Sequence, residues 1–134
     1  MRRILSAALL CTLVLLAAVP ALAQGKTKLT KKAEAIKTGT SREKAIETLG
    51  PATWAVLPAD GGPGSIADLP GVALQLQWSN GEKCFPVTLL FDDDMKVQMI
   101  DHGAICFDKA LDQSVMPPGD YSCEKPDRSS LCKL

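Results

Sequence analysis

The side chains with the clearest capacity for chemistry in this chain are its cysteines. The sequence of 134 residues contains five, and Cys11 lies inside an apolar N-terminal run. The remaining four are Cys84, Cys106, Cys123 and Cys132. An even set in an exported protein indicates disulfides. Zinc is the competing interpretation, but it requires C-x-x-C pairs or histidine partners, and neither spacing is present. We therefore expect two disulfides, and neither a metal nor a cofactor.

The other polar residues do not form a known catalytic or ion-binding pattern. The single histidine, His102, has no strained serine nucleophile to activate, because Ser65 lacks the second glycine of a G-x-S-x-G elbow. The aspartates at 92–94 are adjacent, whereas an EF-hand loop spaces its acids at alternate positions and closes with a glutamate. We expect His102 at the surface, the aspartates in a hairpin turn, and no catalytic residue.

Residues 1–23 have the pattern of a secretory signal peptide of bacterial type. Two arginines precede a long apolar run, and Ala21-Leu22-Ala23 is a small-x-small cleavage site. An uncleaved membrane anchor is the alternative, although the run is a little short for a span. We expect cleavage before Gln24, a periplasmic or secreted location, and no stable membrane insertion afterwards. Cys11 comes too early in the run to be a lipid-attachment site.

Residues 24–134 are long enough for one small domain with a modest core. The full chain has 15 basic and 15 acidic residues, so removing the two leader arginines leaves a slight acidic excess. This balance does not suggest a nucleic-acid partner. Within the domain we distinguish a core module at 29–101 and a cysteine-bearing tail at 102–134.

Two short helices are expected at the start of the domain. Leu29, Ala33 and Ile36 have helical spacing, and Gly39 ends this first segment. The next stretch, "GTSREKAIETLGP" (39–51), fits a capping box in which Thr40 is the N-cap and Glu43 the reciprocal partner, with Ser41 as an alternative N-cap. Its apolar stripe is narrow, and a Gly-Pro pair ends it.

Strands follow the helices. A short candidate lies at 53–57, and residues 72–78 alternate so that Gln75 and Gln77 occupy a wet face opposite a buried one. Asn80-Gly81 favours a type I′ hairpin turn into a strand at about 84–91, and residues 97–100 return as the last strand. The expected class is α+β: two short N-terminal helices packed on a three- to four-stranded antiparallel meander, with a disulfide-tied C-terminal tail.

The meander also suggests how the cysteines pair. If Phe91 lies opposite Lys96, then Cys84 lies opposite Gly103, three residues before Cys106. A bridge requires Cα atoms within about 7 Å, which a small bend would provide. We expect Cys84–Cys106 and, by remainder, Cys123–Cys132, although four cysteines allow other pairings.

The ordered set of elements resembles the SmpA/OmlA (BamE-like) domain, whose fold is shared by modules like the β-lactamase inhibitor protein. Its helical pattern G-x-S/T-x-x-x-(V/A)-x-x-x-L-G-x-P is matched by Gly39, Ser41, Ala45, Leu49 and Gly50. Trp78 corresponds to the family's strand tryptophan, and residues 91–97 resemble its F-D-x-x-G-K-V turn. The resemblance covers about residues 29–101. In this chain the proline follows Gly50 directly, Met95 stands at the turn glycine, a lipid-anchor cysteine is missing, and a tail is added.

This resemblance implies a non-enzymatic protein-binding or scaffold module of the bacterial envelope, or a small inhibitor-like secreted protein. The partner is an unidentified envelope or secreted protein. A small exported enzyme or metal-binding protein is the remaining alternative, and it needs His102, Asp101 and the acids at 92–94 to converge. The expected contact surface is the wet sheet face and the 58–71 loop. Its candidate residues are Gln75, Gln77, Trp54, Asp60 and Ile66.

Overall fold

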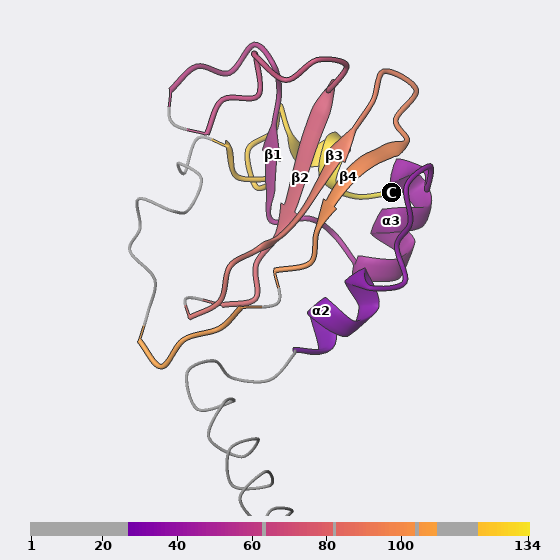
Figure 1. Ribbon diagram of the computed structural model, residues 1–134. Helices are drawn as coiled ribbons and strands as arrows, with labels where there is room; N and C mark the ends of the chain where they lie inside the picture. Colours follow the sequence, from indigo (N-terminus) through magenta and orange to yellow (C-terminus); the bar gives the residue numbers. More distant parts are fainter. Residues whose placement is uncertain (1–26, 63, 82, 104, 110–120) are drawn as a thin grey trace, which may run out of the picture.

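The computed structural model describes residues 27–62, 64–81, 83–103, 105–109 and 121–134, and its centre is an antiparallel sheet of four strands. The strands are β1 (Trp54–Val56), β2 (Leu74–Trp78), β3 (Val87–Phe91) and β4 (Val97–Asp101). They lie side by side in chain order (Figure 1). The predicted α+β class and antiparallel meander are confirmed. The predicted signal peptide falls outside the described residues.

Within the described ranges, three short helices accompany the sheet: α2 (Lys28–Ala33), α3 (Arg42–Leu49) and α4 (Ser129–Cys132). The N-cap of α3 is Ser41, whose Oγ accepts a hydrogen bond from the Lys44 amide at 3.1 Å. The preferred assignment to Thr40 was therefore wrong and the alternative is confirmed. The Thr40 hydroxyl accepts instead from the Lys37 amide. In the described part of the chain, no helix is long and apolar enough to cross a membrane.

The helices cover one face of the sheet, which we call the first face. Its core contains the inward residues of all four strands together with Ala45, Ile46 and Leu49 from α3. The indole Nε1 of Trp78 donates to the Gly50 carbonyl oxygen at 2.8 Å, which ties β2 to the end of α3. Because a helix as short as α3 is marginal alone, this packing is what stabilises it.

The β3–β4 pairing contains an irregularity that the sequence did not reveal. Phe91 lies opposite Val97, and a register shift between Leu90 and Phe91 places Leu90 opposite Met99. The predicted pairing of Phe91 with Lys96 was therefore wrong. The turn between the strands includes Met95 in the left-handed region (φ 57°).

Both predicted disulfides are present. The shifted register brings Cys84 opposite Cys106, with Cα atoms 4.0 Å apart, and Cys123 is joined to Cys132. The register shift adds one extra residue to β4, and this moves Cys106 closer to the position opposite Cys84. It therefore provides part of the movement that we had expected from a bend in the chain.

The Asn80-Gly81 pair does not form a two-residue hairpin turn, because β2 ends at Trp78 and β3 begins only at Val87. Asn80 instead bridges three segments: its Oδ1 accepts from Thr27 Oγ1, and its Nδ2 donates to the carbonyl oxygens of Phe85 and Gly103. A Cβ at residue 103 would lie 2.6 Å from the carbonyl oxygen of Phe85. Glycine is required there because the backbones approach so closely.

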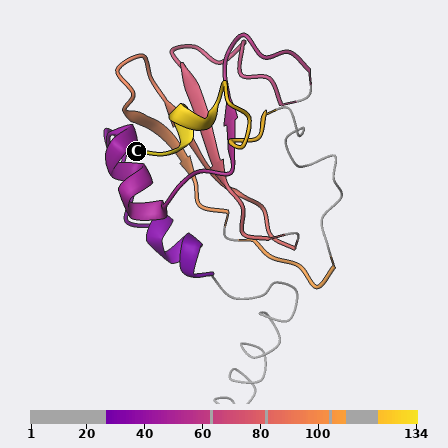
Figure 2. The same ribbon diagram turned by 180° about the vertical axis from the view of Figure 1, so that it is seen from behind.

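The tail is built into the domain. Residues 122–132 lie beside the outer edge of β1, and α4 lies on the side of the first face, in front of the strands in Figure 2, which shows the molecule from behind. Cys132 is 2% exposed and belongs to the first-face core. Arg42 on α3 donates to the Leu131 carbonyl oxygen at 2.8 Å, so the first turn of α3 also holds the tail.

Candidate functional site

The second face of the sheet, opposite the helices, carries two cross-strand rows of side chains. Their membership follows from the strand register, since directly paired residues share a face. One row is Trp54, Gln77, Thr88 and Asp101. The other row is Val56, Gln75, Leu90 and Met99.

Part of this face is covered by loop and tail. Val56 and Leu90 form a small apolar cluster with Ile66 and Val72 of the β1–β2 connection and Tyr121 of the tail. The cover does not extend to β4, where Met99 is 61% exposed. We call the accessible remainder the open surface. It consists of Trp54, Gln75, Thr88, Met99 and Asp101.

Two of the expected contact residues lie beneath the surface. Gln77 is 9% exposed, and its Nε2 donates to Thr88 Oγ1 at 3.1 Å, while its buried Oε1 has no hydrogen-bond partner among the residues that the structure describes. Ile66 is 2% exposed. The expectation of a uniformly wet sheet face is therefore corrected, because Gln77 is flanked on its row by the larger Trp54 and Ile66 covers the apolar row.

Asp60 is largely buried in an ion pair and is not available on the contact surface. Its carboxylate receives two hydrogen bonds of 2.6 Å from the Arg128 guanidinium and one of 2.7 Å from the Leu57 amide. The hydrogen bonds from Arg128 hold the pKa of Asp60 below its ordinary value, against the opposing effect of burial. Asp60 thus fastens the start of the β1–β2 connection to the tail.

Arg128 was missed by sequence reasoning, although it organises this region. It is 7% exposed, donates to the Ala55 carbonyl oxygen at 2.8 Å, and places its guanidinium 5.2 Å from the centre of the Tyr121 ring. The Tyr121 hydroxyl in turn donates to the Gly61 carbonyl oxygen. An arginine in a polar tail carries no sequence signal for such a position, because the hydrogen-bond partners that bury it, Ala55 and Asp60, are more than sixty residues away.

The residues required for the enzyme or metal-binding alternative are not brought together. The acids at 92–94 lie before β4, whereas Asp101 and His102 lie at its other end, separated by about 3.3 Å for each strand residue. As predicted for a turn, Asp92 Oδ1 accepts from the amides of Asp94 and Lys96. Among the described residues, no three His, Cys, Asp or Glu side chains are grouped as metal ligands.

Of the expected contact surface, what stays accessible is a sheet surface that mixes an aromatic residue, an exposed methionine and polar groups. The two disulfides indicate an oxidising, exported environment. No protein-family model matches the chain, and neither does any curated protein or solved structure.

Proposed function

We propose that this chain is an exported, non-enzymatic module, periplasmic or secreted, that binds a protein partner through the open surface. The observation that carries the proposal is Met99, which is 61% exposed in the middle of β4 while the first face of the same sheet is closed by helices. Exposed methionine and partly exposed tryptophan are residue types enriched where proteins associate. Gln75 and Thr88 add hydrogen-bonding groups beside them.

The positions of the SmpA/OmlA-like residues support a scaffold of that kind. Gly39 donates its amide to the Val97 carbonyl oxygen at 2.7 Å, and Val97 donates to Thr40 at 2.8 Å. The helical half of the pattern therefore contacts its turn half directly. Met95, at the position of the turn glycine, has a left-handed backbone that glycine adopts without strain. An envelope scaffold or an inhibitor-like role both follow from this resemblance.

Site-specific photo-crosslinking tests the proposal. The full-length chain is expressed in the native cell with a photoreactive amino acid at Met99, Gln75 or Thr88, and a matched control carries it at Lys44, whose side chain is 65% exposed on the outer side of α3. We expect one protein to be crosslinked from the open surface and not from Lys44. Loss of that product on Met99→Lys in a Gln75-labelled chain would support the contact.

Equal products from Lys44 and from the sheet, or none from any of the three sheet positions, would contradict the proposal. The captured protein also separates the two roles. A hydrolase whose activity falls when the purified chain is added indicates an inhibitor, whereas an envelope assembly component indicates a scaffold.

A further inference from the structure

The two disulfides have different surroundings. Cys84 and Cys106 are 6% and 4% exposed and lie between two backbone hydrogen bonds, from Phe85 to Ile105 and from Phe107 to Lys83. In the other bond, Cys132 is 2% exposed but Cys123 is only partly buried. Among the four bonded cysteines, Cys123 is therefore the one that solvent reaches best.

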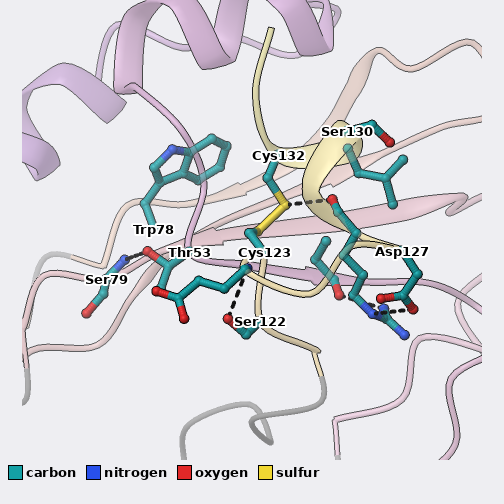
Figure 3. The surroundings of a disulfide bond; sticks show 12 residues. Thr53, Trp78, Ser79, Ser122, Cys123, Asp127, Ser130 and Cys132 are labelled. Carbon is teal, nitrogen blue, oxygen red and sulfur yellow. Dashed lines mark hydrogen bonds and ion pairs between the residues drawn. A yellow bond between two sulfur atoms is a disulfide. The ribbon is translucent and has the colours of Figure 1, made fainter.

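Cys123 also lines a hollow. Cys123 and Cys132 both line a cleft of about 570 Å³ at the outer edge of β1. The other walls include Pro51, Thr53, Ser122 and Lys133. Figure 3 shows the bond between α4 and the strand edge, with Thr53 and Ser122 beside Cys123. A cleft of this size admits a small organic molecule.

We propose that Cys123–Cys132 is the redox-active bond of this protein and a substrate for thiol–disulfide exchange, whereas Cys84–Cys106 is structural. A thiolate of a small thiol or of a dithiol reductase enters the cleft and attacks Cys123 Sγ. The Cys123–Cys132 bond breaks, a mixed disulfide forms on Cys123, and Cys132 leaves as a thiolate that takes up a proton. A second thiolate then attacks the reagent sulfur, which releases the oxidised reagent and leaves Cys123 reduced.

The bond matters to the sheet because the loop that it closes covers the edge of β1. Cys123 donates its amide to the Thr53 carbonyl oxygen at 3.0 Å, and Ala52 donates to the Cys132 carbonyl oxygen at 2.9 Å. Arg128, between the two cysteines, donates to the Ala55 carbonyl oxygen. Reduction removes the covalent restraint on this loop, so the β1 edge opens more often. An open edge presents unpaired backbone groups to another extended chain.

Reduction kinetics of the folded protein test the exchange. The oxidised chain is incubated with increasing dithiothreitol or glutathione, quenched with an alkylating reagent, and each cysteine pair is quantified by peptide mass spectrometry. We expect Cys123 and Cys132 to be labelled at least about tenfold faster than Cys84 and Cys106. Their rate should rise in proportion to thiol concentration, because attack in an accessible cleft needs no unfolding.

Equal labelling of the two pairs, or faster labelling of Cys84 and Cys106, would overturn the proposal. So would a rate for Cys123–Cys132 that reaches a plateau with thiol and increases in mild denaturant, since that behaviour means that the bond reacts only after the protein opens.

Hydrogen exchange tests the consequence for the β1 edge. The double variant Cys123→Ser/Cys132→Ser is compared with the matched variant Cys84→Ser/Cys106→Ser. We expect the backbone amides at positions 52 and 123 to exchange at least about tenfold faster in the first variant than in the second. The same amides are followed in wild-type protein during partial reduction, which gives an answer even if either variant fails to fold. Unchanged protection of Ala52 after loss of the bond would refute a covering role.

Discussion

The two faces of this sheet are built from the same strands but are closed in different ways. On the first face, β2 and β3 present large apolar residues that are completely buried, including Leu74, Leu76, Leu89 and Phe91, beneath three helices. On the second face, the positions of the same two strands are mostly polar (Gln75, Gln77 and Thr88, with Leu90), and the cover is a loop and one tyrosine. Stability is therefore concentrated on the first face, and accessible surface on the second.

The cover on the second face also depends on a different kind of interaction. The first face is held by close packing of apolar side chains, which is not sensitive to pH. The loop over the second face is attached through Asp60 and Arg128, whose side chains are 13% and 9% exposed. The loop is thus held by a charged contact in addition to its small apolar cluster, whereas the first face is held by apolar packing.

The two faces should differ most in how much stability is lost when an apolar side chain is shortened to alanine. Leu76→Ala removes a fully buried side chain from the first face and should lower the free energy of unfolding by about 3 kcal/mol. Met99→Ala, on the second face of β4, should change it by less than about 0.5 kcal/mol. Denaturant unfolding of both variants measures the contrast, and similar losses would mean that Met99 is buried in solution.

Next in size is the attachment of the loop. Asp60→Asn removes the closer of the two charged partners of Arg128 and leaves only the exposed Asp127, so it should cost about 2 to 4 kcal/mol, as for other largely buried ion pairs that lose one member. Asp68→Asn is the matched control, because Asp68 is exposed in the same loop. If both variants unfold at the wild-type denaturant concentration, Asp60 does not fasten the loop.

The same contact predicts a dependence on pH. The pKa of Asp60 is lowered by Arg128, so its stabilising contribution is complete above its ordinary pKa of 3.8 and is lost as the pH falls through the lower folded-state value. Wild-type protein should therefore lose more stability than Asp60→Asn between about pH 4 and pH 2. Parallel stability curves for the two proteins in that range would be inconsistent with the ion pair.

A smaller effect is expected at the start of α3, the helix that covers the first face. Ser41→Ala removes the N-cap acceptor and should cost about 1 kcal/mol. Thr40→Ala removes a hydroxyl that bonds the exposed Lys37 amide and should cost less. Thermal unfolding of the two variants compares their losses of stability. A larger loss for Thr40→Ala than for Ser41→Ala would mean that Thr40 is the N-cap.

Met99→Lys should affect stability least of all, by no more than about 0.5 kcal/mol. Its expected effect is on association, because a charge in the centre of the open surface must be desolvated when a partner covers it. Retained crosslinking together with unchanged stability would place the contact elsewhere on the molecule.

Much of this arrangement was readable from local pattern. Alternation predicted which side chains of β2 point to the core, since adjacent strand residues face opposite sides. Val72 was expected on the same side, but it precedes β2 and packs in the apolar cluster of the second face. The even cysteine count and the meander together predicted both disulfides. Local pattern failed where two neighbouring residues could play the same role. Thr40 and Ser41 can both cap a helix. Because the Thr40 carbonyl oxygen accepts a hydrogen bond from Val97 of β4, the helix starts after Ser41, which is the N-cap.

The candidate surface was predictable only in part. Trp54 and Gln75 are accessible on the second face as expected, but Gln77 is buried on the same strand face. The exposure of a side chain on a sheet depends on which loop or tail residues pack over it. Alternation along a strand shows only which face a side chain is on, and not what covers that face. Met99 was not among the candidates, because its inward or outward direction depends on the register shift beside Leu90.

By itself, the sequence determined the α+β class, the order of the strands, the face of β2 that forms the core, and the presence of two disulfides. Each of these follows from periodicity, turn chemistry or counting, which act over short distances along the chain. The tertiary structure decided the register of β4, the burial of Gln77 and Ile66, the ion pair of Asp60 with Arg128, and the cleft beside Cys123. These depend on segments that are distant in sequence and meet only in the folded chain, where packing selects among locally equivalent alternatives.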